Sequence, residues 1–310
     1  DPSALEKYRT MLAEQIQYFK VTQYFFFKQW TELKNYANQK GIQIIGDMPI
    51  YVAADSVEVW TKPELFQLDE ERNPLFVAGV PADQFSATGQ LWGNPLYAWE
   101  EHKKQGYAWW IHRIEESFKI YDVLRIDHFK GFSDYWQVDG KAEVAKDGSW
   151  QPGPGYDLFK AVKEQLGDLP IIAEDLGNID DKARKLLTDC NYPGMKILQF
   201  GFEDVSGESL DSPHYCIPHS IVYTGTHDND VTNGWYNSLT EQQQQYINDY
   251  THRHEDESIC QAMIRQLFAT VSNTAIATMQ DVLDLPASSR MNVPSTIGGN
   301  WQWRMQQSDL

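Results

Sequence analysis

Short, β-branched apolar runs alternate along this chain with segments of helical periodicity, and this alternation restricts the fold more than any other feature. None of the runs is joined to the next by a hairpin turn. Strands that alternate with helices form parallel β/α units. The pattern therefore predicts an α/β protein, with strands over 42–46, 123–126, 170–173, 196–200, 220–224 and 275–279.

Four of these runs end in an acidic side chain that is followed by a loop. These side chains are Asp47, Asp127, Glu174 and, just past the fifth run, Asp228. Enzymes built as (β/α)8 barrels place their chemistry at the carboxyl ends of parallel strands. We therefore predict a TIM-type barrel whose active face is marked by these four carboxylates.

Helical spacing of apolar residues predicts helices over 24–39, 107–121 and 257–271. Capping boxes predict two helix N-termini, one at Ser3-x-x-Glu6 and one at Thr240-x-x-Gln243. Glycine, proline and polar residues predict loops over 141–155 and 203–219.

The charge of the chain limits its partners. Its 310 residues include 44 acidic and 26 basic side chains, which gives a formal charge of −18. Such a chain is repelled by polyanions, so nucleic acid and anionic membrane surfaces are disfavoured. No stretch reaches 18 uninterrupted apolar residues, and the first residues lack a signal pattern. The scattered Cys190, Cys216 and Cys260 favour a reducing, cytoplasmic setting.

Aromatic side chains are unusually frequent, with 11 Trp, 16 Tyr and 14 Phe. Flat, amphipathic rings suit the apolar faces of sugars or the planes of bases. Because the net charge disfavours bases, sugars are the better match. Most of these rings are still expected to pack in the core or on helix faces.

Arg125 and Asp127 occupy one face of the strand predicted over 123–126, because side chains alternate along a strand. An arginine two residues before an aspartate stabilises the ionised carboxylate, which a carboxylate nucleophile requires. The alternative is a structural ion pair inside the barrel.

Apolar residues crowd the approach to Glu174, and desolvation raises the pKa of a carboxyl group towards that of a general acid. Spacing alone leaves open whether Glu174 or Asp175 faces the substrate. Gly225 permits a close turn, after which His227 and Asp228 would project into a loop at the active face. The asparagine, aspartate and threonine residues of this segment are equally well explained as ordinary turn residues. Two acids in opposite protonation states are the machinery of glycosidic cleavage, and a separation of about 5–5.5 Å favours the retaining route.

Several motifs together resemble the 4-α-glucanotransferases, also called amylomaltases or disproportionating enzymes, of the retaining α-amylase-like clan. The match runs in order over residues 24 to 304. Its segments include Gly46-Asp47-Met48-Pro49-Ile50-Tyr51, Gly89-Gln90-Leu91-Trp92-Gly93-Asn94-Pro95, Arg125-Ile126-Asp127-His128-Phe129, Ala173-Glu174-Asp175-Leu176-Gly177, Thr226-His227-Asp228-Asn229 and Arg290-Met291-Asn292-x-Pro294.

The resemblance implies roles for single residues. It makes Asp127 the nucleophile, Glu174 the acid/base and Asp228 the residue that holds the distorted donor sugar. Asp47, Arg125 and His227 would line the donor subsite. On the acceptor side it implies substrate contacts from Phe85, Gln90, Trp92 and Asn94, in an aromatic lid that excludes water from the covalent intermediate.

The family resemblance also shapes the expected domain organisation. We find six β/α units where a closed barrel has eight. We therefore expect residues 1–310 to form one catalytic barrel portion, about strands 3 to 8, with 61–110 inserted as an acceptor-side lid. The first two β/α units would be absent from this chain. The missing N-terminal part would then be a partner, without which the segment is poorly active.

Other functions stay open on the residues alone. Acidic and histidine side chains at strand ends also bind divalent ions, which would make a metal-assisted hydrolase. A non-catalytic maltodextrin-binding module, or an inactive fragment of such an enzyme, would keep the aromatic rings without the chemistry. The leading expectation is a 4-α-glucanotransferase that uses no cofactor and no metal and acts on maltodextrin or other α-1,4-glucans.

Overall fold

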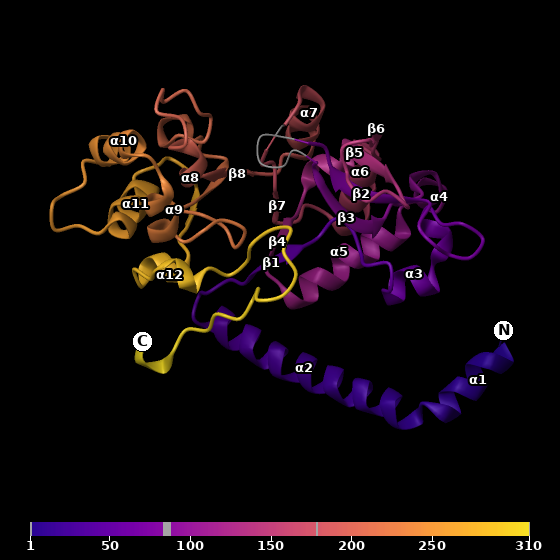
Figure 1. The fold of residues 1–310 in the computed structure, drawn as a ribbon. Helices are drawn as coiled ribbons and strands as arrows, with labels where there is room; N and C mark the ends of the chain where they lie inside the picture. The colour runs from indigo at the N-terminus through magenta and orange to yellow at the C-terminus, as the bar shows by residue number, and fades with distance from the viewer. Residues whose placement is uncertain (1, 83–87, 178, 310) are drawn as a thin grey trace.

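The computed structural model describes residues 2–82, 88–177 and 179–309 (Figure 1). The strands predicted from sequence form two parallel sheets. The first has the order β1-β4-β7, with β1 (Ile45–Met48), β4 (Val123–Ile126) and β7 (Ile171–Ala173). The second has the order β10-β9-β8, with β8 (Gly194–Ile197), β9 (Ser220–Tyr223) and β10 (Thr274–Ile276). The Ala173 N–H donates to the Pro193 carbonyl at 3.0 Å, which joins the edges of the two sheets.

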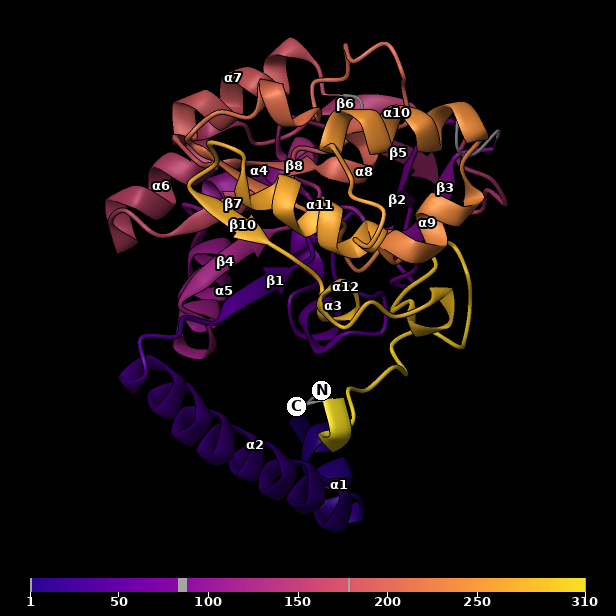
Figure 2. The same cartoon turned by 90° about the vertical axis from the view of Figure 1, so that its left-hand side faces the viewer.

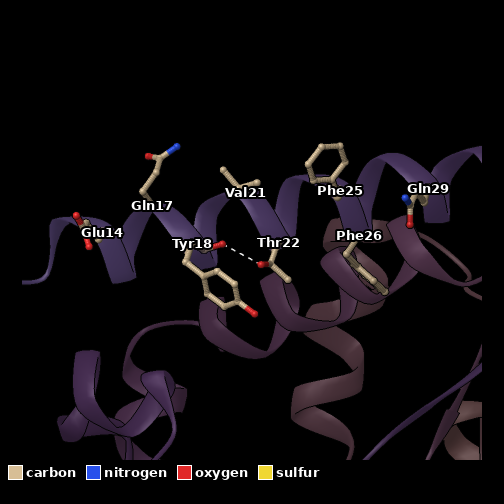
Figure 3. Close-up of a pocket in the computed structure, with 8 residues that line it drawn as sticks. All are labelled: Glu14, Gln17, Tyr18, Val21, Thr22, Phe25, Phe26 and Gln29. Atoms are coloured by element: carbon tan, nitrogen blue, oxygen red, sulfur yellow. Dashed lines mark hydrogen bonds between the residues drawn. The ribbon is translucent and has the colours of Figure 1, made fainter.

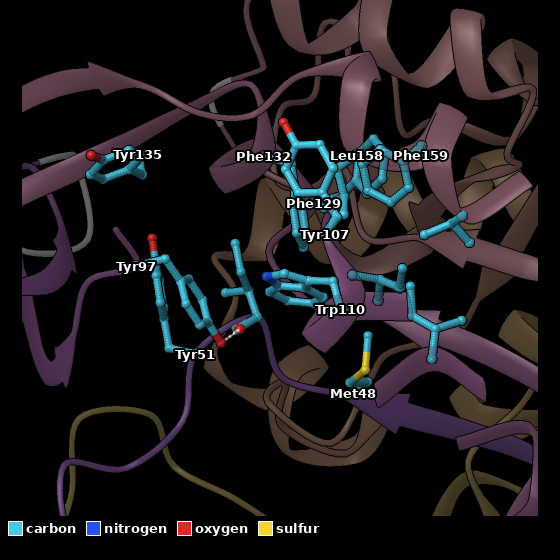
Figure 4. Close-up of a cluster of buried hydrophobic side chains, with 14 of the residues drawn as sticks. Met48, Tyr51, Tyr97, Tyr107, Trp110, Phe129, Phe132, Tyr135, Leu158 and Phe159 are labelled. Atoms are coloured by element: carbon cyan, nitrogen blue, oxygen red, sulfur yellow. Dashed lines mark hydrogen bonds between the residues drawn. The ribbon is translucent and has the colours of Figure 1, made fainter. Parts of the chain in front are cut away.

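Helices cover the first sheet and bury its apolar side chains. The covering helices are α5 (Ala108–Ile120), α6 (Tyr156–Leu166) and α7 (Asp181–Cys190). Leu124 and Ile126 are fully buried against this layer, as their place on the strand predicts. The Trp110 ring lies at the centre of the cluster, 5.3 Å from the Tyr97 ring and 5.1 Å from the Phe132 ring (Figure 4).

A second apolar cluster lies under the helices that follow β8 and β9. These helices are α8 (Leu198–Gly201), α9 (Thr232–Ser238), α10 (Glu241–Thr251) and α11 (Ile259–Phe268). The short helix α12 (Met279–Val282) follows β10. The predicted capping box at Thr240 is confirmed, and a second one, at Ser258 and Gln261, begins α11.

A four-stranded antiparallel sheet was not expected from the sequence. Its order is β3-β2-β5-β6, with β2 (Phe76–Val80), β3 (Gln90–Pro95), β5 (Asp134–Asp139) and β6 (Ser149–Pro152). The prediction of a loop throughout 141–155 was therefore wrong, because β6 pairs with β5 inside it. Only β2 and β3 of this sheet lie within 61–110. Between residues 49 and 107 the chain also forms α3 (Val57–Thr61) and α4 (Trp99–Lys104).

Two strands are displaced from their predicted positions. The run predicted over 42–46 becomes β1 at Ile45–Met48, and the run over 196–200 becomes β8 at Gly194–Ile197. Leu198 directly begins α8 and is fully buried, so the apolar signal continues past the end of the strand. Burial alone does not distinguish a strand from a buried helical turn.

The N-terminal helices α1 (Pro2–Met11) and α2 (Ala13–Gln39) extend along one side of the molecule (Figures 1 and 2). No residue of either helix is buried. Trp30 Nε1 and Lys34 Nζ tie the end of α2 to the body, each donating at 2.8 Å to a carbonyl at the end of α5. The capping box predicted at Ser3 was wrong, because the helix already includes Pro2, a residue suited to the first helical turn.

A shallow surface pocket is lined only by residues of α2, among them the aromatic side chains of Tyr18, Phe25 and Phe26 (Figure 3). The helix predicted over 24–39 is confirmed as part of α2. Its aromatic side chains are exposed except for Trp30, which is half-buried against α5. In the described ranges, no helix has the length and apolar character needed to cross a bilayer.

Candidate active site

Arg125 joins two carboxylates across neighbouring strands. Its Nη1 lies 2.6 Å from Asp47 Oδ1 and 3.0 Å from Asp127 Oδ1. The parallel register sets Asp47 opposite Arg125, and Asp127 follows on the same face of the chain. The Arg125 side chain is only 9% exposed, whereas those of Asp47 and Asp127 are 41% and 40% exposed. A buried cation thus stabilises two carboxylates that remain open to solvent.

Electrostatics keep this arginine charged. Burial by itself lowers the pKa of the Arg125 guanidinium, but the charges of Asp47 and Asp127 outweigh burial and raise it. The sequence-based expectation that Arg125 and Asp127 lie on one face of the strand agrees with this geometry, but only Arg125 is buried on it.

Glu174, rather than Asp175, faces the charges of Asp127 and Arg125. Its Oε2 accepts the His128 N–H at 2.7 Å, and its Oε1 accepts the Leu176 N–H at 2.8 Å. Burial and the nearby charge of Asp127 raise the pKa of Glu174 to about 7. A carboxyl group with this pKa can donate a proton near neutral pH and accept one later in a reaction.

Asp175 has a structural role on the other side of the strand end. Its carboxylate accepts the Met195 N–H at 2.7 Å, and a Cβ at Gly194 would lie only 2.4 Å from its Oδ2. This contact fastens β7 to β8. The alternative that the sequence left open is thereby resolved in favour of Glu174 as the residue turned towards Asp127.

Asp228 lies in the loop after β9 and is held by a distant segment. The Asn292 amide donates to Asp228 Oδ1 at 2.7 Å, and Arg290 Nη2 donates to the Asp228 carbonyl at 2.8 Å. His227 Nε2 lies 3.4 Å from Asp228 Oδ2, and its ring packs 5.1 Å from that of Trp301. The charge of His227 acts on Asp47, so this loop adjoins the first sheet.

The predicted acceptor-side residues lie on β3. Trp92 is 37% exposed, donates from Nε1 to Gln90 Oε1 at 3.2 Å, and packs edge-on against the His128 ring at 4.8 Å. The Asn94 amide donates to the Val52 carbonyl at 3.0 Å, so this hydrogen bond already fixes its orientation. Phe85 lies outside the described residues.

Sequence reasoning missed three functional candidates. Arg290 and Asn292 entered only as part of a family motif, yet they hold Asp228. Tyr223 ends β9 beside the charges of Arg125 and Asp47, and burial raises its pKa to about 12. Its position at the end of a predicted parallel strand was the available signal.

A group with the spacing of metal ligands occurs on α5. It consists of the exposed side chains of His112, Glu115 and Glu116, and no other group of three such ligand side chains meets this spacing within the described residues. These residues lie on the helix layer and not at the strand ends.

Comparison with known proteins gives one consistent family. A family model described as 4-alpha-glucanotransferase matches residues 1–308. The chain is 54% identical over 309 residues to a 4-alpha-glucanotransferase of Streptococcus pneumoniae serotype 4, covering 99% of this chain and 61% of the relative. It is 43% identical to the 4-alpha-glucanotransferase of Thermus thermophilus, covering 100% of this chain and 63% of the relative.

Solved structures agree with the sequence relatives. The amylomaltase of Streptococcus agalactiae in complex with acarbose superposes with a TM-score of 0.98 at 60% identity, covering 100% of this chain and 62% of that chain. The amylomaltase of Corynebacterium glutamicum, 16% identical with a TM-score of 0.71, covers 88% of this chain and 44% of that chain and shows a common fold. The chain spans about three-fifths of the length of the curated relatives, 61% in the first case.

Proposed function

The chain belongs to the 4-alpha-glucanotransferase family, and on that premise we propose that it transfers a segment of an α-1,4-glucan from a donor maltodextrin to the 4-OH of an acceptor glucose or glucan. The reaction would be a retaining double displacement through a covalent glycosyl-enzyme. One observation carries the proposal: Nη1 of the buried Arg125 lies 3.0 Å from Asp127 Oδ1. The pKa of the adjacent Glu174, raised to about 7, supports it.

In the first step, an Asp127 carboxylate oxygen attacks the anomeric carbon of the donor sugar. The glycosidic C–O bond breaks, and the proton of Glu174 passes to the departing oxygen. The ion pair with Arg125 supports this role, since it stabilises the charged nucleophile without covering it.

In the second step, Glu174 takes the proton of the acceptor 4-OH while that oxygen attacks the anomeric carbon. The bond to Asp127 breaks, and both carboxyl groups return to their starting states. Transfer instead of hydrolysis requires that a sugar hydroxyl reaches the intermediate before water does. The half-exposed Trp92 supports an acceptor subsite, because its ring can stack on a sugar face.

Asp228 and His227 would hold the distorted donor sugar together with Asp47 and Arg125. Asp228 is open to solvent on one side, with its Oδ1 fixed by Asn292. A carboxylate held in this way can accept two sugar hydroxyls in a defined orientation.

Disproportionation of maltotriose tests the proposal, since transfer of a maltosyl unit releases glucose. We expect Asp127→Asn to lower glucose release by about 10⁴-fold or more while maltotriose binding persists. Asp168→Asn, which changes an 85% exposed aspartate, is the matched control. Unchanged turnover in the Asp127 variant would contradict the assignment of the nucleophile.

The wider organisation is a proposal of its own. We propose that the six parallel strands belong to an eight-stranded barrel, with 61–110 as its acceptor-side insertion and with polypeptide outside these residues supplying the other two β/α units. The two parallel sheets and the greater length of the relatives support this. Assaying residues 1–310 with and without the N-terminal part of a relative tests it, and full activity of the segment alone would refute it.

We also propose that the protein works in a reducing, cytoplasmic setting. The free thiols of Cys190, Cys216 and Cys260 support this.

A further inference from the structure

His128, the residue directly after Asp127, has a left-handed backbone. Its φ of +50° lies in a region that residues other than glycine seldom adopt, although asparagine, aspartate and histidine occur there more often than the rest. Residues held in this way occur where the surrounding structure imposes the conformation, often at functional sites. The contacts of His128 with its neighbours therefore determine this conformation.

The left-handed turn directs two consecutive N–H groups at one residue. The His128 N–H donates to Glu174 Oε2 at 2.7 Å, and the Phe129 N–H donates to the Glu174 carbonyl at 3.0 Å. The Leu176 N–H fixes the other carboxylate oxygen at 2.8 Å. Both carboxylate oxygens of Glu174 are thus held by backbone donors. The φ of His128 sets the direction of the chain after its Cα, so the Phe129 N–H is the donor that depends on the unusual φ.

The imidazole of His128 is itself packed in place. It meets the Trp92 ring at 4.8 Å, and a Cβ at Gly131 would lie only 3.1 Å from its Cδ2. Burial lowers the pKa of His128 to about 4, with Asp127 and Lys130 as the charged groups that act on it. The ring is therefore neutral near pH 7 and acts by packing rather than by charge.

We infer that His128 is a positioning residue for the acid/base. Its N–H holds the Glu174 carboxyl group, its left-handed φ directs the Phe129 N–H to the Glu174 carbonyl, and the Trp92 ring holds His128 in that conformation. This rests on the proposed function, because it assigns Glu174 the proton that the leaving oxygen receives. It links the acceptor-side strand β3 to the proton donor without giving His128 any contact with the reacting atoms.

A comparison of two donors isolates this role. Maltotriose needs a proton on its departing oxygen, whereas α-maltosyl fluoride loses fluoride without one as Asp127 bonds to the anomeric carbon. A variant that only weakens the fold lowers both rates equally. Fluoride release is measured in the first turnover, before Glu174 is needed as the base of the second step. A variant that misplaces Glu174 then lowers the maltotriose rate selectively.

All variants are made in the full-length natural polypeptide, so that any segment outside residues 1–310 is present. In His128→Val, a β-branched residue opposes the left-handed φ, and we expect maltotriose turnover to fall about tenfold or more beyond any fall in fluoride release. His128→Asn and His128→Gly tolerate that φ and should keep the wild-type ratio of the two rates. Should the Val variant not fold, His128→Ala takes its place. His112→Val, on the exposed face of α5, is the matched control.

Two further variants complete the test. Glu174→Gln should lower the maltotriose rate selectively by about 10²–10⁴-fold; if it does not, the proposed function itself fails. If Glu174→Gln discriminates between the donors and His128→Val does not, the inference about His128 alone is overturned. Trp92→Ala should change the ratio of the maltotriose rate to the fluoride rate less in the His128→Asn variant than in the wild type, because asparagine adopts the left-handed φ without the Trp92 contact. Equal changes in both backgrounds would overturn the role of Trp92.

Discussion

The two parallel sheets hold their carboxylates in different ways. In the first sheet, Asp47 and Arg125 are register partners on adjacent strands, and Asp127 follows at the strand end. In the second, Asp228 lies in a loop beyond β9 and is fixed by Asn292, 64 residues further along the chain. Strands of the first sheet place the groups proposed to make and break bonds, whereas loops of the second place the group proposed to bind the donor sugar.

This difference predicts unequal sensitivity to mutation. A group held by strand register depends on a buried cation that no other side chain replaces. The Asp228 carboxylate depends on the single amide of Asn292, while Arg290 holds only the main-chain carbonyl of Asp228, and the loop can relax. Substitutions around the first sheet should therefore affect both activity and stability, and those around the second mainly the donor affinity.

The largest effect is expected from Arg125→Gln. Removing the cation leaves Asp47 and Asp127 facing each other, so we expect activity to fall about 10²–10³-fold. The free energy of unfolding should fall by about 2–3 kcal/mol, less than the 3–5 kcal/mol of a fully buried pair because both aspartates are partly exposed. Denaturant titration measures the second value, and Arg184→Gln in the surface pair with Asp181 is the control. A variant as active as the wild type would show that the ion pair is only structural.

The pH dependence should follow Glu174. Because its pKa is raised to about 7 and its protonated form is the proposed acid, kcat/KM should fall about tenfold per pH unit above that value. The folded protein retains this proton between about pH 4.5 and 7, where the unfolded chain loses it. Stability should therefore decrease as pH rises through that window, by on the order of 3 kcal/mol. In Glu174→Gln the basic limb of kcat/KM should disappear, and the loss of stability with rising pH should become smaller, since Asp47, Asp175 and Asp211 also have raised pKa values. A basic limb that survives in the variant would assign it to another group.

A smaller effect is expected from Asn292→Ala, which removes the hydrogen bond that holds Asp228 beside the second sheet. Loss of one hydrogen bond to a carboxylate should raise KM for the donor about fivefold to tenfold with little change in stability. Asn237→Ala, on the exposed face of α9, is the matched control. An unfolding midpoint lowered as far as in Arg125→Gln would show that the two sheets do not differ in this respect.

The smallest effect is expected from metal removal. Since Arg125 already supplies the positive charge next to Asp127, treatment with a chelator should leave maltotriose disproportionation unchanged. Glucose release measured before and after dialysis against EDTA checks this. Activity lost to EDTA and restored by a divalent ion would favour the metal-assisted alternative instead.

The sequence predicted what depends on local pattern. The strand at 123–126 and the helix over 107–121 were recovered because apolar periodicity directly reflects burial. The family resemblance, read from motifs at the strand ends, is confirmed by the family model. The choice between Glu174 and Asp175 needed coordinates, because neighbouring residues at a strand end differ only in direction.

The features that the sequence did not predict depend on contacts between residues far apart in the chain. The antiparallel sheet was not predicted because β3 and β6 each contain proline and no β-branched residue, and because β2 pairs with β5 across more than 50 residues. Arg290 and Asn292 reach Asp228 from a segment with no regular secondary structure, so no periodicity marks them. Contacts of this kind are set by tertiary packing and leave no signal in a single sequence.

Trapping the glycosyl-enzyme tests the central claim most directly. In Glu174→Gln incubated with α-maltosyl fluoride, the covalent intermediate should form, because fluoride leaves without a proton, and then persist, because no base activates the acceptor. Peptide mass spectrometry should locate the sugar on Asp127. A sugar on Asp47 or Asp228 would contradict the account, as would turnover of the fluoride with inversion and no labelled peptide.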